Sequence, residues 1–336
     1  MKTEKKKLTD TTLLLLITIV AFFVMYISAV VFLREGFLKP QTFLNILNEN
    51  AALIITSCGM SIVMISGGID ISVGGVVALV CMCCAVNLDM KGGNILTSIL
   101  IALGIGLAFG IVQGFLVAYL DIQPFIITLA GMFFARGMTT IVNEKPFNVA
   151  NEAFVKLKDS RIDIGFLGSY NKKGVFIPGH MEIGVIVALA IVLIMFIVLK
   201  WSKIGRNFYA VGGNAQSALM LGINVKRTKF VSYVLSGLFA GIGGFVYFLH
   251  VGSGAPTHAQ GMEMNAIASS IIGGTLLTGG VGNIIGTLFG VLSLSSIKNI
   301  VSSLGLDQAW WTGITTALML CLFLVVQSIV INRKKK

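Results

Sequence analysis

Long apolar stretches separated by short polar ones dominate the chain. The first apolar run extends from Leu13 to Leu33, and similar runs recur almost to the C-terminus. A run of about 20 apolar residues is long enough to cross a bilayer as a helix. The pattern therefore predicts an all-α, polytopic membrane protein with about ten transmembrane helices. The predicted spans are 11–33, 44–66, 72–89, 95–120, 124–142, 181–200, 230–250, 264–279, 283–304 and 310–331.

Two glycine-rich breaks interrupt this pattern. The first runs from Ser66 to Gly75 and the second from Gly273 to Asn283. Glycine-rich backbone is a poor helix interior, and at membrane depth it is tolerated only where protein buries it or where it lines a wet cavity. Two such breaks at corresponding places in the two halves indicate an internal pseudo-repeat, and transporters often bind substrate between repeats. Whether the breaks are re-entrant or simple turns stays open.

Asp70 stands out within the first break. An ionisable side chain beside membrane spans is costly and usually marks a pathway. The simpler alternative is that Asp70 caps a helix that begins at Ile71 or Ser72. The sequence alone does not choose between a place on a pathway and a helix cap.

Composition agrees with a membrane protein. Of the 336 residues, 56% are hydrophobic and 12% are charged, and the mean hydropathy is +0.92. Soluble domains usually carry about 25% charged residues. The net charge of +11 comes from loops and tails without forming a basic face, so we expect no nucleic-acid partner.

The distribution of cations predicts the topology. Lys and Arg gather before residue 10, in 200–229 and after residue 332, which favours the cytoplasmic side for all three segments. We expect a single integral membrane domain, 1–336, with cytoplasmic tails at 1–10 and 332–336. The mixed-charge segment 143–180 is expected to be an extracytoplasmic loop, and 201–229 a cytoplasmic one.

Motifs for chemistry are missing from the sequence. The five cysteines lie in apolar runs and the three histidines are scattered, so no metal site is expected. No Gly-x-x-x-x-Gly-Lys-Ser/Thr motif occurs, which excludes a Walker-type ATP site in this chain. No catalytic set of residues shares one neighbourhood. We expect a non-enzymatic protein without a cofactor.

The cytoplasmic loop 201–229 contains one recognisable local structure. Asn214 can cap a short helix over 215–221, and Gly222 can end that helix in a left-handed turn. Leu219, Met220 and Leu221 would then be exposed. An exposed apolar helix of this kind invites a protein partner, although it could also rest on the membrane surface.

Polar residues within or beside the spans are further candidates. The triplet Asn48, Glu49 and Asn50 begins span 2 and could bind a polyol at the entrance, or could simply mark an interfacial helix start. Arg136 in span 5 is expected to pair with a carboxylate such as Glu49 or to extend toward the interface. Lys298 in span 9 is expected to extend outward in the same way.

Several motifs resemble one known family, the permease subunits of bacterial ABC sugar importers of the ribose, xylose and galactofuranose type. The resemblance covers nearly the whole chain. The ending Trp310-Trp311-Thr312 looks most like the galactofuranose-type permeases. Where the family usually has aspartate, this chain has Asn265, so a neutral amide replaces the carboxylate at this position. The motifs that carry the resemblance are Gly59 to Gly75, Ile204 to Arg206, Ala210 to Asn214, Gly222 to Val225, Glu263 to Ala268, Gly273 to Gly282 and Gly286 to Leu288.

The resemblance implies a transport function and a set of partners. Two permease subunits, identical or different, would enclose a path across the bacterial plasma membrane for a monosaccharide. A cytoplasmic ATPase subunit would dock on 201–229, and an extracytoplasmic sugar-binding protein would deliver the sugar. The path residues would be Asn48, Glu49, Asn50, Gly67, Gly68, Asp70, Ser72, Gly74, Gly273, Gly274, Thr275, Gly279 and Gly280. The ATPase coupling loop would be shaped by Gly212, Gly213, Asn214, Leu219 and Gly222.

Two other functions remain as alternatives. An ion-coupled secondary transporter or channel would need essential carboxylates, of which Asp70 would be the first. A branched-chain amino-acid ABC permease would carry a zwitterion. The scarcity of ionisable side chains in the spans favours a neutral sugar.

Overall fold

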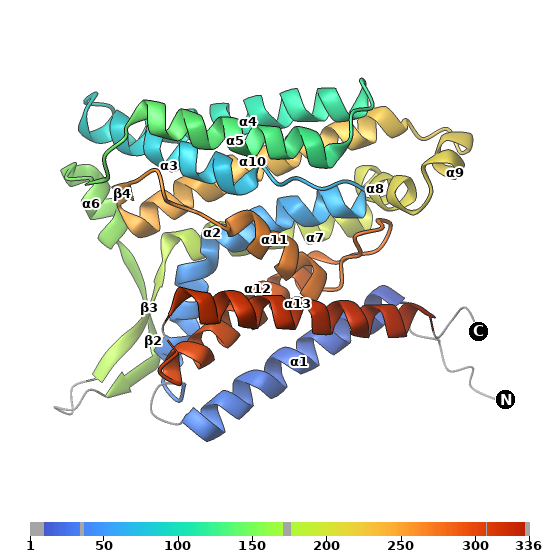
Figure 1. Cartoon of the computed structure of the whole chain (residues 1–336). Helices are drawn as coiled ribbons and strands as arrows, with labels where there is room; N and C mark the ends of the chain where they lie inside the picture. The colour runs from blue at the N-terminus through green and yellow to red at the C-terminus, as the bar shows by residue number, and fades with distance from the viewer. Residues whose placement is uncertain (1–9, 34–36, 171–175, 307, 333–336) are drawn as a thin grey trace.

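The structure is a computed structural model that describes residues 10–33, 37–170, 176–306 and 308–332. Most helices run along one common direction (Figure 1). The predicted tails lie outside the described residues, apart from Asp10 and Asn332. The helices are α1 (Asp10–Leu33), α2 (Pro40–Ile65), α3 (Val73–Asp89), α4 (Ile95–Ala118), α5 (Pro124–Val142), α6 (Glu152–Asp159), α7 (Ile183–Trp201), α8 (Lys203–Gly213), α9 (Ala215–Met220), α10 (Val225–Val251), α11 (Met262–Ile272), α12 (Ile284–Ser303) and α13 (Ala309–Asn332).

Seven helices in the described residues are long and apolar enough to cross a membrane: α1, α2, α4, α5, α7, α10 and α12. Helix α3 and the Gly313–Val325 part of α13 are shorter apolar helices. Together they confirm the predicted polytopic, all-α architecture.

The predicted span 264–279 is wrong in its extent. Helix α11 ends at Ile272, so its 11 residues reach only about 16 Å, roughly half of a hydrocarbon core. The cause is the glycine pair that follows. Gly274 takes a φ of 88°, a left-handed backbone that ends the helix, and the chain continues without helix to Ile284.

The centre of the molecule consists of α2, α3 and α10. In the 18-residue apolar stretch of α2, 89% of the residues are buried, against 22% in the corresponding stretches of α1 and α4 and 17% in that of α5. Close approach of α4 to α10 depends on small residues. A Cβ on Gly110 would lie 2.7 Å from the Tyr233 carbonyl oxygen, and a Cβ on Gly237 would lie 2.6 Å from Gly110 Cα.

The two ends of the molecule differ. The first residue of α1, the last of α13 and helices α8 and α9 lie at one end, which we call the α9 end (Figure 1). Helix α6 and the antiparallel pair β2 (Arg161–Tyr170) and β3 (Phe176–Glu182) lie at the other, the hairpin end. The same-side placement of both described termini agrees with an even number of crossings.

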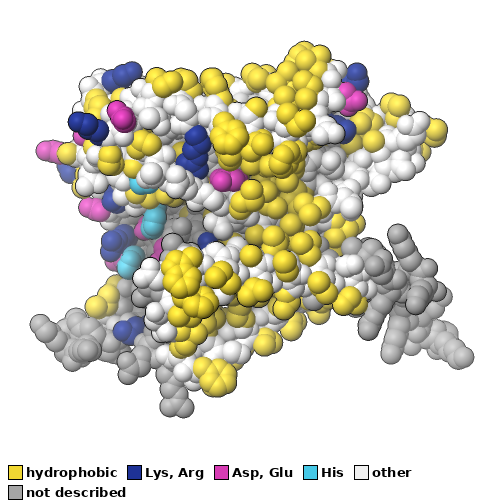
Figure 2. Space-filling model, in the orientation of Figure 1, with side chains coloured by type: hydrophobic (Ala, Val, Ile, Leu, Met, Phe, Trp, Pro, Cys, Tyr) yellow, Lys and Arg dark blue, Asp and Glu magenta, His cyan; other side chains and the backbone are white. Residues whose placement is uncertain are grey.

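The segment 143–180 is more regular than the sequence predicted. It contains β1 (Phe147–Asn148), which pairs with β4 (Ser253–Gly254), then α6 and the β2–β3 hairpin. Charged side chains gather at the hairpin end, while an apolar surface covers much of the middle (Figure 2). This banded surface fits a molecule that sits across a bilayer.

Candidate functional site

Three glycine-rich segments that lie far apart in the sequence meet at the α9 end. The Gly280 N–H donates to the Ile65 carbonyl oxygen over 2.9 Å, which ties the α11–α12 connection to the end of α2. The end of α8 packs into the same place, because a Cβ on Gly212 would collide with that carbonyl oxygen. A Cβ on Gly279 would lie 2.9 Å from Gly67 Cα. We call the contact among these five residues the glycine junction.

The glycine junction tolerates no side chains. Gly67, Gly279 and Gly280 have φ values of 84°, 86° and 73°, a region that L side chains rarely adopt. The next residue along from Gly212 differs, since a Cβ on Gly213 would meet nothing within 4 Å. Backbone therefore contacts backbone at the junction, and no flexible side chain lies between α8 and the two breaks at these positions.

Tyr209 adds a side-chain contact to the junction. The Tyr209 hydroxyl, on α8, donates to the Gly282 carbonyl oxygen over 3.0 Å. Burial raises the pKa of Tyr209 to about 12, so the phenol stays protonated and keeps its hydrogen for this bond. Helix α8 is thus linked to the second break by a hydrogen bond as well as by packing.

The short helix α9 forms as predicted and ends at Met220. The Asn214 side-chain oxygen accepts from the Ser217 N–H over 2.8 Å, which caps its first turn. Gly222 takes a φ of 78° and ends the turn that follows. Leu219 and Met220, with 60% and 80% of their surface exposed, present an apolar face at the very end of the molecule (Figure 1).

Asp70 is buried and fully hydrogen-bonded. One carboxylate oxygen accepts from the Ser72 N–H and hydroxyl over 3.1 and 2.6 Å, and the other accepts from the Ser236 hydroxyl of α10 over 2.7 Å. Helix α3 begins at Val73, so Ser72 takes the cap position and Asp70 fixes the turn before it. No described cation contacts Asp70, and its place is that of an anchor between the first break and α10.

Other predicted path residues lie in packing contacts. A Cβ on Gly68 would lie 2.5 Å from the Tyr233 hydroxyl oxygen, and one on Gly273 would lie 2.5 Å from the Gly286 carbonyl carbon. A Cβ on Gly74 would collide with the Glu263 carboxylate. The Thr275 hydroxyl is buried without a hydrogen-bond partner among the described residues. The structure brings the two breaks together at the junction but leaves these positions closed.

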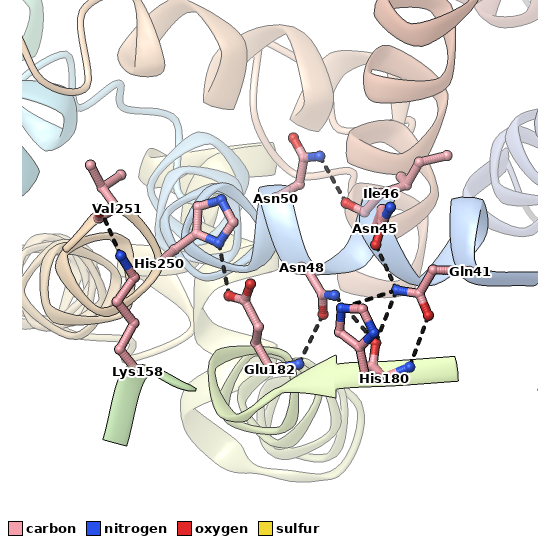
Figure 3. Close-up of polar contacts among 10 residues, drawn as sticks. All are labelled: Gln41, Asn45, Ile46, Asn48, Asn50, Lys158, His180, Glu182, His250 and Val251. Atoms are coloured by element: carbon pink, nitrogen blue, oxygen red, sulfur yellow. Dashed lines mark hydrogen bonds and ion pairs between the residues drawn. The ribbon is translucent and has the colours of Figure 1, made fainter. Parts of the chain in front are cut away.

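The hairpin end contains a side-chain network between α2 and β3 (Figure 3). The Asn48 side-chain oxygen accepts from the Glu182 N–H over 3.0 Å, and the Gln41 side-chain oxygen accepts from the His180 N–H over 2.8 Å. The Glu182 carboxylate lies 2.8 Å from His250 Nδ1 at the end of α10. These bonds fix the hairpin against α2 and α10.

The predicted triplet at the start of span 2 does not act as one unit. Asn48 is buried and bonded to β3, whereas the Asn50 amide donates to the Ser295 hydroxyl of α12 over 2.8 Å. Glu49 is exposed. The helix turns by about 100° per residue, which explains why three neighbours face three directions. Contact with a polyol at this triplet stays a prediction.

Arg136 pairs with a different carboxylate from the one expected. Its guanidinium lies 3.9 Å from Glu263 Oε2 rather than at Glu49, and it donates to the carbonyl oxygens of His258 and Ala259. Lys298 does not simply extend outward, since its ammonium lies 3.3 Å from the Asn265 side-chain oxygen. Both differences arise because α11 starts well inside the molecule, which sequence spacing did not reveal. Like Asp70, Glu263 is an ionisable side chain beside a predicted span, so the sequence already contained a signal that marks it as a candidate.

The fold and these sites define a class: a polytopic helical membrane protein in which a short exposed helix is joined to glycine-rich breaks. The chain belongs to the family described as branched-chain amino acid transport system / permease component, whose model matches residues 42–324. No solved structure matches this chain.

Curated relatives cover most of the chain. The inner membrane ABC transporter permease protein YjfF of Escherichia coli (strain K12) is 36% identical over 292 residues, 87% of this chain and 85% of the relative. The fructose import permease protein FruG of Bifidobacterium longum is 33% identical, over 88% and 84%. The ribose import permease protein RbsC of Escherichia coli (strain K12) is 34% identical, over 90% of each chain.

Proposed function

We propose that this chain is the membrane-spanning permease subunit of an ATP-driven sugar importer. The observation that carries the proposal is that α9 follows directly on α8, whose Gly212 packs in the glycine junction. An apolar helix exposed at one end is fit to receive a protein partner, and the junction behind it joins both breaks. The relatives named for ribose and fructose import support a sugar as the substrate.

The partners follow from this assignment. A cytoplasmic ATPase subunit docks on α9, with Gly212, Gly213, Asn214, Leu219 and Gly222 shaping the docking loop. The start of α1 and the end of α13 then face the cytoplasm, because they lie at the same end as α9 (Figure 1). A second permease subunit completes the path, and an extracytoplasmic binding protein delivers sugar at the hairpin end.

The mechanism is a mechanical one. ATP hydrolysis in the partner moves α9 and α8, and the backbone contacts of the junction pass this movement to the ends of α2 and of the α11–α12 connection. The junction acts as the gate at the cytoplasmic side of the path. We propose that Asn48 and Asn50 hold the hairpin and α12 in place.

The bonding of Asp70, the first carboxylate that an ion-coupled carrier was expected to use, favours this function over that alternative. Coupling ions require a carboxylate that is free to bind a proton or cation, whereas Asp70 accepts three hydrogen bonds from neutral donors. The family name allows an amino-acid substrate, but the relatives FruG and RbsC are named for the import of fructose and of ribose.

Purification from the native membrane tests the proposal. The detergent-solubilised protein is expected to bring an ATPase with it, and vesicles that contain the complex and the binding protein are expected to take up sugar only with ATP. Uptake by the lone protein that runs on a proton or sodium gradient would overturn the proposal.

A further inference from the structure

Three ionisable side chains lie at one depth inside the apolar helices. Arg136 stands six residues before the end of α5 and Lys298 five residues before the end of α12, which places both roughly 8–9 Å inside the hairpin end. Glu263 lies in the first turn of α11, which begins between them. Charges at such a depth face protein or water because lipid cannot solvate them.

Helix α11 begins without a cap inside the molecule (Figure 1). Gly261 occupies the cap position with a φ of 75°, and no side chain accepts from the first-turn N–H groups. Two residues of this turn each meet one cation, Glu263 at Arg136 and Asn265 at Lys298. The positive end of the helix and the Arg136 guanidinium thus face a single carboxylate, and Lys298 lies at the amide two residues further along the same turn.

This chain does not close the space in front of that turn. Met264, which lies between Glu263 and Asn265, has 57% of its surface exposed. The Arg136 side chain has 20% of its surface exposed, and the Glu263 side chain has 11% exposed. We call the feature formed by Arg136, Glu263, Met264, Asn265 and Lys298 the α11 recess.

The α11 recess contains both hydrogen-bond donors and hydrogen-bond acceptors that have no partner among the described residues. Glu263 is nine-tenths buried, and its Oε2, which packs against Gly74, accepts no hydrogen bond among the described residues. Its Oε1 accepts none among them either, so this second oxygen is the acceptor left for a ligand. The Asn265 amide nitrogen donates to no described group, and the Lys298 ammonium uses one of its three hydrogens. An apolar lipid tail satisfies none of these groups, whereas sugar hydroxyls both donate and accept.

We propose that the α11 recess is the place on the permease where the sugar binds. Glu263 accepts from one hydroxyl, while Asn265 and Lys298 donate to others, and Arg136 holds Glu263 in position. The inference rests on the proposed function, since it assigns the sugar site of that same transporter. It adds residues that neither the breaks nor the relatives' names identify.

Cysteine labelling of the intact complex in vesicles tests the α11 recess. Met264→Cys is made in a background where Cys83 and Cys321, the two free cysteines that are not buried, are serine. A membrane-impermeant, positively charged methanethiosulfonate is added from the hairpin side. We expect labelling, because the recess is wet, and we expect it to slow by at least about threefold with the transported sugar among D-ribose, D-fructose and D-galactose. Phe134→Cys, an exposed position of α5 on the groove toward α4, is the control that faces lipid and stays unlabelled.

The outcomes separate this inference from the proposed function. Met264→Cys that resists labelling means that lipid or a second copy of the chain covers the recess, and overturns the inference even if ATP-driven uptake is normal. Labelling that the transported sugar does not slow overturns it as well. A second variant, Glu263→Gln, is expected to reduce uptake about tenfold while the ATPase still co-purifies, since a charged acceptor is lost. Loss of the ATPase from the unmodified protein would instead count against the proposed function.

Discussion

The hairpin end and the α9 end are held together by different kinds of contact. At the hairpin end, side chains such as Asn48 and Gln41 bond to the backbone of β3. At the α9 end, the backbone at Gly212 packs directly against the Ile65 carbonyl. Side-chain bonds can be lost singly at modest cost, whereas backbone packing leaves no room for even one added methyl group. The hairpin end is therefore suited to holding the β2–β3 hairpin in place, and the α9 end is suited to transmitting movement.

The largest effect is expected at α9. Leu219→Asp combined with Met220→Asp places two charges on the exposed apolar face, and the cost of desolvating them should abolish co-purification of the ATPase. Membrane insertion should remain. The control is Leu38→Asp, an equally exposed leucine beside the start of α2, which should retain the ATPase. Normal assembly of the double variant would refute docking at α9.

The buried carboxylate of the first break should come next. Asp70→Asn replaces an acceptor of three hydrogen bonds by a neutral amide, a loss of about 1.5–3 kcal/mol for one charge-assisted bond. Uptake should fall roughly tenfold with the ATPase still bound. Asp89→Asn, the same change at a surface carboxylate that accepts from the Ala150 N–H, should be silent in the same uptake assay.

A smaller effect is expected in the network of Figure 3. Asn48→Ala removes the acceptor for the Glu182 N–H. Because the Asn48 side chain is buried, its loss leaves that N–H without its hydrogen-bond partner, and the free energy of unfolding should fall by about 1–2 kcal/mol. Thermal unfolding of the purified protein measures this, and ATPase binding should not change. Asn45→Ala, which alters only an exposed contact to Gln41, is the matched control. A variant as stable as its control would show that Asn48 does not anchor the hairpin.

The smallest effect is expected from Tyr209→Phe. It removes the hydrogen bond to Gly282 but keeps the ring that packs against the hydrophobic core, so the cost is about 0.5–1.5 kcal/mol. Uptake per ATP hydrolysed should fall by less than for Asp70→Asn. Tyr209 is placed behind the docking surface and not within it. If the Tyr209→Phe variant no longer binds the ATPase, this placement is wrong.

Much of the architecture could be predicted from periodicity and caps, and the departures have physical causes. Asn214 and Gly222 defined α9 because a cap and a left-handed glycine act locally. The span over 264–279 failed because apolar composition says nothing about where a glycine pair ends a helix. Glu263 was missed as the partner of Arg136, since only the recessed start of α11 brings the two together.

The glycine junction shows the same limit. Both breaks and Gly212 were visible in the sequence as separate features, but their contact depends on how three chain segments fold against one another. No local pattern encodes that Gly212 is packed while Gly213 faces open space.

The most direct test of the central claim compares these two neighbours. Sugar uptake per ATP hydrolysed is measured for Gly212→Ala and Gly213→Ala in vesicles that contain the whole complex. Because a Cβ at Gly212 collides with the Ile65 carbonyl and one at Gly213 meets nothing, Gly212→Ala should keep its ATPase but lose at least about tenfold in uptake per ATP. Gly213→Ala should match the unmodified protein. Equal uptake per ATP in the two variants would contradict transmission of movement through the glycine junction.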